Sequence, residues 1–286
     1  MLWLPFCRKL EAPLTSLLPA GSVDESELPF ARRSVLDESA LDKPQRALAS
    51  LKREVLRMSE VVEATMAPVM EIYLNYDPKR AAALRRHDKY VNFALDNIRR
   101  YVAAMSARKT TKPELKKARE LTEYAIALES AGDIVVNRLL ALAEEKADLS
   151  IRFSKAGREE LISMHERVMA NMDLASNVLI SDDLESARLL LEEKAEMNRA
   201  ERSNRRKHLK RLSAGEEISF QSSDVHLETL RCFKDFNSQI ATVAYPVLYS
   251  NGQLLETQLI HELDQEILDD EQKTGRGGGT VPSQLP

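Results

Sequence analysis

Long runs of helical periodicity with little glycine restrict the fold of this 286-residue chain more than any other feature. From about Pro44 to Tyr76, apolar side chains recur every three or four residues, which is the spacing of one face of an α-helix. Only nine glycines occur, and four of them lie close together between positions 275 and 279. Asn251-Gly252 is the one Asn-Gly or Asp-Gly pair, the dipeptides typical of hairpin turns. The sequence therefore predicts an all-α protein.

The composition is that of a soluble globular protein. Hydrophobic residues make up 43% of the chain and charged residues 30%, and the net charge of −4 gives no reason to expect a nucleic-acid partner. Two cysteines, Cys7 and Cys232, provide neither a disulfide framework nor a Cys-x-x-Cys metal site, which favours a reducing compartment. No segment approaches the roughly 18–20 apolar residues that a membrane-spanning helix needs. We therefore expect a soluble protein.

Prolines and capping residues divide the chain into segments. Residues 1–43 carry four prolines and no sustained period, so a linker is expected there, and residues 271–286 are predicted to be a disordered tail. Pro68 is expected to kink the first helix and Pro246 to bend a later one, and Thr111-Lys-Pro-Glu114 has the sequence of a capping box. The helical patterns cover about 44–76, 78–105, 111–148, the residues after Ser154, 183–212, 223–249 and a shorter stretch within 251–270.

The chain resembles itself after a shift of 105 residues. The identities are sparse, but they need no gap across three successive helical patterns. Matching positions include Arg53-Glu54 with Arg158-Glu159, Asp77 with Asp182, and Asp88-Lys89 with Glu193-Lys194. This period is too long for a solenoid unit. We interpret it as a duplication that gives two tandem three-helix bundles related by a pseudo-two-fold axis, at 44–150 and 151–250, followed by a helix at 251–270.

Two carboxylates four residues apart are the main chemical signal in the chain. Glu129 and Asp133, with Asn137 one turn further on, share one face of a helix that is otherwise mostly apolar. Two such carboxylates repel each other and cannot both stay ionised in a dry interior, whereas a multivalent cation would stabilise them. A solvent-facing acidic pair and a salt bridge to a basic neighbour are the alternatives. Spacing alone leaves the three open.

Two further carboxylates are candidates for a shared site. Asp88 and Glu193 occupy equivalent positions in the two copies of the repeat. The alternative is that both are ordinary charges on helix surfaces. In the second copy, Lys234 and Ser238 stand where the first copy has the Glu and Asp pair, so one hypothesis is that Lys234 supplies positive charge in place of a metal.

No motif in the chain indicates an enzyme. The five histidines lie outside any Glu-x-x-His or His-Glu-x-x-His arrangement, which argues against a carboxylate-bridged metalloenzyme or a zinc hydrolase. The chain also lacks a P-loop, a dinucleotide fingerprint and a nucleophile elbow. The densest basic run, Arg199–Arg211, is either a solvated helix face or a contact surface for anionic lipid or an acidic partner.

The duplicated bundle with Glu-x-x-x-Asp on its third helix resembles the PhoU family of phosphate-homeostasis regulators. The matching residues are Leu128-Glu-Ser-Ala-Gly-Asp-Ile-Val-Val-Asn137 in the first copy, and His226–Ile240 followed by Ala244-Tyr-Pro246 in the second. The resemblance covers about 44–250 and is greatest to the PhoU-like cytoplasmic domain of bacterial sodium/phosphate cotransporters. Residues 1–20 resemble the exit of a last membrane helix and its linker, so the chain is expected to be a fragment or a detached regulatory domain.

The resemblance implies a non-enzymatic regulator of phosphate uptake. Its expected partner is the membrane domain of a sodium/phosphate transporter, in cis or in trans, at the cytoplasmic face of the inner membrane, and a homodimer is also expected. The family binds metal clusters through its Glu-x-x-x-Asp motifs, which implies iron, zinc or manganese at Glu129 and Asp133. Asp88 and Glu193, equivalent in the repeat, are the further candidate ligands. A second cluster is not expected, because Lys234 and Ser238 replace the second motif. The alternative function is a stand-alone helical scaffold that binds signalling partners without a metal or phosphate role.

Overall fold

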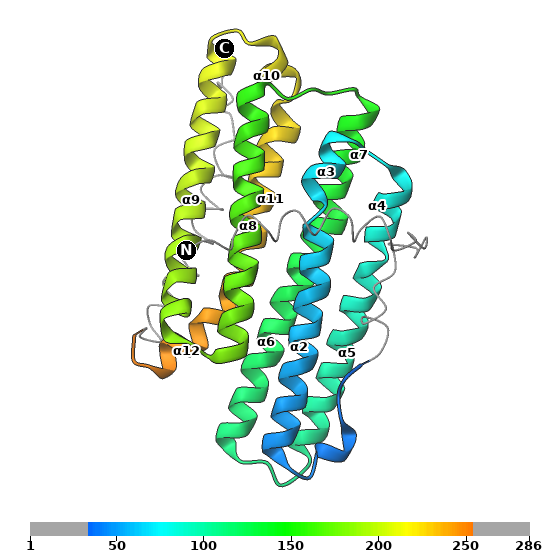
Figure 1. Cartoon of the computed structure of the whole chain (residues 1–286), viewed down its shortest axis with the longest axis vertical. Helices are drawn as coiled ribbons and strands as arrows, with labels where there is room; N and C mark the ends of the chain where they lie inside the picture. Colours follow the sequence, from blue (N-terminus) through cyan, green and yellow to red (C-terminus); the bar gives the residue numbers. More distant parts are fainter. Residues whose placement is uncertain (1–33, 254–286) are drawn as a thin grey trace, which may run out of the picture.

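The structure, a computed structural model, describes residues 34–253, and every regular element in that range is helical. The predicted all-α fold is confirmed. Figure 1 shows two groups of long helices that lie side by side with roughly parallel axes, α2, α5 and α6 in one and α8, α9 and α11 in the other. Three predictions fall partly or wholly outside the described residues: most of the linker (1–33), most of the last helix (254–270) and the tail (271–286).

The first half of the chain is divided where proline and capping residues require it. The helix predicted over 44–76 breaks at Pro68, which lacks an N–H and whose ring crowds the preceding turn. The capping box is confirmed, because the backbone N–H and the hydroxyl of Thr111 both donate to Glu114, at 2.9 and 2.8 Å. The elements are η2 (Glu38–Ala40), α2 (Pro44–Met66), α3 (Val69–Leu74), α4 (Pro78–Arg85), α5 (His87–Ser106), α6 (Lys112–Asp133), the π-helix η3 (Ile134–Leu139) and α7 (Leu140–Asp148).

The second half follows the same order with a local shift. Asp77 caps α4 by accepting a hydrogen bond from the Lys79 N–H at 2.8 Å, but its partner in the repeat, Asp182, ends α8 in a left-handed conformation (φ 52°). The capping role passes to Asp183, which accepts from the Ser186 N–H at 2.8 Å. The elements are α8 (Lys155–Ser181), α9 (Leu184–Ser213), α10 (Glu217–Gln221), α11 (Ser223–Ile240), η4 (Ala241–Val243) and α12 (Ala244–Ser250).

Residues 34–43, the described end of the predicted linker, pack against the first bundle. The Val35 N–H donates to the fully buried carboxylate of Glu54 at 2.7 Å, and Glu54 also pairs with Arg57 one turn along α2. From α5, the Tyr101 hydroxyl donates to the Asp37 carbonyl at 2.8 Å. This segment is therefore anchored by buried polar contacts, which a proline-rich sequence does not reveal.

A continuous apolar core joins the two halves. Helix α6 packs on α2 and α5 within its own half and on α11 across the seam, and α2 also packs on α8. Tyr73 and Phe233 are among the largest fully buried side chains. The Tyr73 hydroxyl lies 3.1 Å from the Thr229 hydroxyl of α11 and forms a buried hydrogen bond between the halves.

Two histidines of the second half form a buried polar cluster with an ion pair. The rings of His208 and His226 stack with centroids 4.6 Å apart, and the two side chains are almost fully buried. Arg211 donates to both oxygens of Glu160 at 2.9 and 2.8 Å, and His226 Nε2 lies 3.3 Å from the same carboxylate. Burial lowers the pKa of His208 to about 4, and the positive charges of His226 and Arg211 act in the same direction.

We expect the free energy of unfolding to decrease as the pH falls from about 6.5 to about 4. The unfolded chain binds a proton at His208 near pH 6.5, whereas the folded protein binds it only near pH 4, so protons favour the unfolded state in this window. In His208→Gln this loss of stability should shrink by about 1 kcal/mol or more, measured by urea unfolding at several pH values. The exposed Lys210→Gln provides the control on the same helix turn. Identical pH profiles for wild type and His208→Gln would contradict this assignment.

Candidate functional site

Three of the four carboxylates predicted from the sequence come together in the first half of the chain. Asp88 lies in the first turn of α5, and Glu129 and Asp133 lie near the end of α6. All three are half-buried. The apolar faces of α6 are covered by α2, α5 and α11, and its last two acidic residues, Glu129 and Asp133, lie beside Asp88 of α5.

Burial and the close approach of these carboxylates raise the pKa values of Asp88 and Glu129. Burial raises the pKa of Asp88, and the negative charge of Asp133 and a hydrogen bond to Asp133 raise it further. The hydrogen bond from the Asn92 amide lowers this pKa and so opposes these effects. Burial also raises the pKa of Glu129, with the charges of Asp133 and Asp88 adding to the effect and Arg99 opposing it. The three groups therefore form one electrostatically coupled cluster.

One oxygen of this cluster lacks a donor. Asp88 Oδ2 accepts from the Asn92 amide at 2.8 Å, but Asp88 Oδ1 is buried and has no hydrogen-bond donor among residues 34–253. Because two carboxylates present only acceptors to each other, Asp88 and Asp133 need a proton or a cation between them. Oxygen donors suit hard or borderline metal ions. No three His, Cys, Asp or Glu side chains within the described range converge into a preformed metal site.

A π-helix follows the cluster directly. Residues Ile134–Leu139 widen the helix immediately after Asp133, and the Asn137 amide in this turn donates to Asp133 Oδ1 at 3.0 Å. Single π-helical turns often occur at functional sites. The sequence does not reveal this turn, because the consecutive apolar residues Ile134, Val135 and Val136 fit an α-helical pattern equally well.

Glu193, the fourth predicted ligand, lies on α9 in the other half of the chain. Its carboxylate is 3.7 Å from Arg167 of α8. Figure 1 shows α9 and α5 on opposite sides of the molecule, so the equivalence of Glu193 and Asp88 in the repeat does not bring them together.

The second copy replaces the acidic cluster by a network of mixed charge. Lys234 Nζ lies 3.1 Å from Asp235 of the same helix, and Arg138 of the π-helix reaches across the seam to Asp235 at 3.1 Å and to Glu228 at 2.5 Å. Within residues 34–253, no ion pair joins Lys234 to Glu129, and the cation that lowers the pKa of Glu129 is Arg99. The sequence analysis did not identify Arg138 as a link between the halves, because its partners are about 90 residues away.

The basic run of α9 is divided into paired and unpaired cations. Arg199 pairs with Glu196, Arg205 with Glu201 and Arg211 with Glu160. By contrast, three cations at four-residue spacing are exposed: Arg202, Arg206 and Lys210. No carboxylate of the described chain lies within ion-pair distance of these three side chains. The surface of α9 therefore keeps a short basic stripe, Arg202–Arg206–Lys210.

Comparison with known sequences defines the class of this protein. Residues 55–139 match the model of the PhoU domain. Over 231 residues, 80% of the chain, it is 33% identical to a Salmonella typhimurium protein described as "Putative inorganic phosphate export protein YjbB", of which it covers 42%. A protein of the same description from Escherichia coli K12 is 32% identical over 226 residues, which are 79% of the chain and 41% of that relative. The chain thus spans about two fifths of the length of the curated relatives that it matches.

Solved structures show the same fold. The phosphate transport system regulatory protein PhoU from Streptococcus pneumoniae aligns with a TM-score of 0.65 at 14% identity, over 75% of this chain and 100% of its own. PhoU from Pseudomonas aeruginosa aligns with a TM-score of 0.62 at 18% identity, over 72% and 97% of the two chains. The protein is therefore a PhoU-like all-α helical protein. It carries a PhoU domain in its first half and is related in sequence to the YjbB proteins.

We expect Asp88→Asn to stabilise the metal-free protein at neutral pH. A raised carboxyl pKa means that the folded state favours the protonated form, so the contribution of Asp88 to stability is greatest at low pH and is lost as the pH rises through its folded pKa. Removing one of the clustered negative charges should raise the free energy of unfolding at pH 7 by about 0.5 kcal/mol, the size of a like-charge repulsion on a helix surface. Urea unfolding in a chelator tests this.

Asp96→Asn, an exposed change on the same helix, serves as the control. A lower urea midpoint for Asp88→Asn than for Asp96→Asn in the presence of chelator would show that the cluster is not repulsive.

Proposed function

We propose that this chain is a non-enzymatic regulatory domain that controls the movement of inorganic phosphate through a membrane transporter. The observation that carries the proposal is the similarity over 80% of the chain to proteins described as putative phosphate exporters. The PhoU domain supports it, because a solved protein of the same fold is described as the regulatory protein of a phosphate transport system. The relatives' description widens the expected role from phosphate uptake to phosphate flux in either direction.

The proposed partner is the membrane domain of a transporter of the sodium/phosphate cotransporter type, in cis or in trans. More than half of each relative's length lies beyond the part that this chain matches, which leaves room for such a domain in those proteins. Within residues 34–253, no helix is both long and apolar enough to cross a bilayer. The domain would act from the cytoplasmic face of the inner membrane.

Co-expression of the full chain with a bacterial sodium/phosphate transporter membrane domain tests the proposal. We expect the two to co-purify from detergent-solubilised membranes, and the initial rate of radiolabelled phosphate flux in cells to change at least two-fold when the chain is omitted. Absence of co-purification together with unchanged flux would instead support a helical scaffold with other partners.

The carboxylate cluster is proposed to bind a transition-metal ion, iron, zinc or manganese, as part of this regulation. Asp88, Glu129 and Asp133 would supply the oxygen ligands, because their mutual repulsion and the donor-free Asp88 Oδ1 are relieved by a cation. Glu193 is not among these ligands, since it pairs with Arg167.

Elemental analysis of protein purified without chelator tests the metal site. We expect one of the three metals at near-stoichiometric content in wild type and Asp96→Asn, and at least a five-fold lower content in Asp88→Asn and Glu129→Gln. Equal metal content in all four proteins would show that the ion binds elsewhere. Absence of metal from the wild type would contradict the metal site and would mean that a shared proton stabilises the cluster.

The basic stripe Arg202–Arg206–Lys210 is proposed to contact the anionic lipid surface beside the transporter. Exposed apolar side chains lie near it in sequence, Leu209 on α9 and Phe220 on α10, of which Phe220 is 70% exposed. Basic and apolar groups together are typical of membrane-surface contacts. In co-sedimentation with phosphatidylglycerol vesicles, reversing the three charges to Glu should abolish binding, whereas reversing the paired Arg199 should not.

A further inference from the structure

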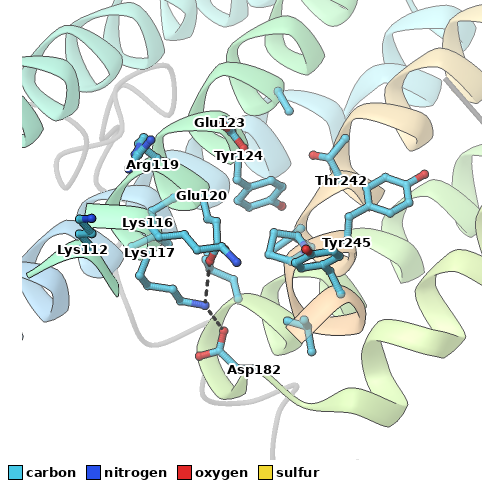
Figure 2. A pocket seen from close by; sticks show the side chains of 17 residues that line it. Lys112, Lys116, Lys117, Arg119, Glu120, Glu123, Tyr124, Asp182, Thr242 and Tyr245 are labelled. Atoms are coloured by element: carbon cyan, nitrogen blue, oxygen red, sulfur yellow. Dashed lines mark hydrogen bonds and ion pairs between the residues drawn. The ribbon is translucent and has the colours of Figure 1, made fainter. Parts of the chain in front are cut away.

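A cleft of about 780 Å³ lies at the seam between the two halves. Its walls come from α6, the end of α8 and the η4–α12 turn, as Figure 2 shows. The cleft and the carboxylate cluster share α6, since the cleft lining extends along this helix from Lys112 to Ala127. None of Asp88, Glu129 and Asp133 lines the cleft. The two sites therefore use different side chains of the helix.

One wall of the cleft carries four cations of α6. Lys117 is neutralised, because it lies 2.9 Å from Asp182, which also binds Lys52 at 2.9 Å. Lys116 lies 3.9 Å from Glu120 and 4.9 Å from the centre of the Tyr249 ring. Figure 2 shows the lysines along one side of the cleft and Asp182 below them.

Two cations of this wall have no counter-charge among residues 34–253. Lys112 and Arg119 are both exposed, and no carboxylate of the described chain forms an ion pair with either side chain. Arg119 makes one weak hydrogen bond, at 3.4 Å, to the Leu115 carbonyl of its own helix. Their positive charge is therefore available to an anion from solution.

The opposite wall is apolar and aromatic. The apolar lining residues include Leu179, Val243, Pro246 and Val247. Figure 2 shows Thr242 and Tyr245 on the side of the cleft away from the lysines. Tyr245 is held in place by Lys194, whose ammonium donates to its hydroxyl at 2.9 Å. A cleft with one cationic and one apolar wall matches a ligand that has a charged end and an apolar or aromatic body.

We propose that this cleft binds an organic phosphate, a phosphomonoester carried on an apolar or aromatic body. Lys112 and Arg119, the two cations of the lining that have no ion pair within residues 34–253, suit a phosphate group, which lysine binds as a point charge and arginine through paired hydrogen bonds. The volume falls within the range of small-molecule sites, roughly 300–1,000 Å³, and is far larger than inorganic phosphate needs. A nucleotide and a lipid phosphate share this chemistry. The proposal does not depend on the transporter partner or on the metal site.

Titration calorimetry of the full chain with four probes tests the proposal. The probes are adenosine monophosphate, dihexanoyl phosphatidic acid below its micelle concentration, adenosine and inorganic phosphate. We expect at least one of the two organic phosphates to bind at least ten-fold more tightly than adenosine and inorganic phosphate, and the tighter of the two identifies the source of the ligand. Binding of neither organic phosphate at millimolar concentration would overturn the proposal, as would equal binding of inorganic phosphate.

Variants separate the two walls of the cleft. The double change Lys112→Ala and Arg119→Ala should weaken binding of the organic phosphate at least ten-fold, and because both side chains are exposed and unpaired it should leave the fold unchanged. The matched control is Lys89→Ala with Arg100→Ala, two exposed cations of α5. Tyr249→Ser should weaken the binding of the organic phosphate but not that of inorganic phosphate. Unchanged affinity in the Lys112 and Arg119 double variant would overturn the assignment of the cleft.

Discussion

Helix α6 has to pack on both halves of the molecule at once, and the rest of the structure depends on this constraint. It lies against α2 and α5 in the first bundle and against α11 in the second. Leu121, Tyr124 and Leu128 are among the α6 side chains that this arrangement buries. With most of its circumference covered, α6 can place polar groups only in narrow strips. Its lysines line the cleft near its start, and Glu129 and Asp133 lie beside Asp88 of α5 near its end.

The two halves share a fold but distribute charge in opposite ways. In the first, Asp88, Glu129 and Asp133 leave an excess of negative charge that burial makes costly. In the second, Lys234 and Arg138 neutralise Asp235, so the equivalent region is stable without an added cation. Each half thus has three long helices, while the charged residues of the two halves differ. The PhoU domain match, at residues 55–139, falls on the half that retains the acidic cluster.

The sequence predicted the fold well where local rules decide the structure. Apolar spacing identified the long helices, Pro68 marked a break, and the Thr111 capping box is present. The i, i+4 spacing also placed Glu129 and Asp133 on one face. The failures arose from contacts distant in sequence. The packing of 34–43 depends on Glu54 and Tyr101, and the repeat could not show that Glu193 would pair with Arg167. The cleft was not foreseen, because its two walls come from different halves.

The π-helical turn at Ile134–Leu139 fixes the rotational phase between the two ends of one continuous helix. Upstream of it, Asp133 faces Asp88, and downstream Arg138 reaches Glu228 and Asp235 of the other half. Each α-helical residue turns the chain by about 100°, so the extra residue held in a π-turn displaces everything beyond it by about that angle. If this turn closed to a regular α-helix, the acidic cluster and the Arg138 bridge could not both keep their partners. The turn therefore sets the rotational position of Arg138 relative to Asp133.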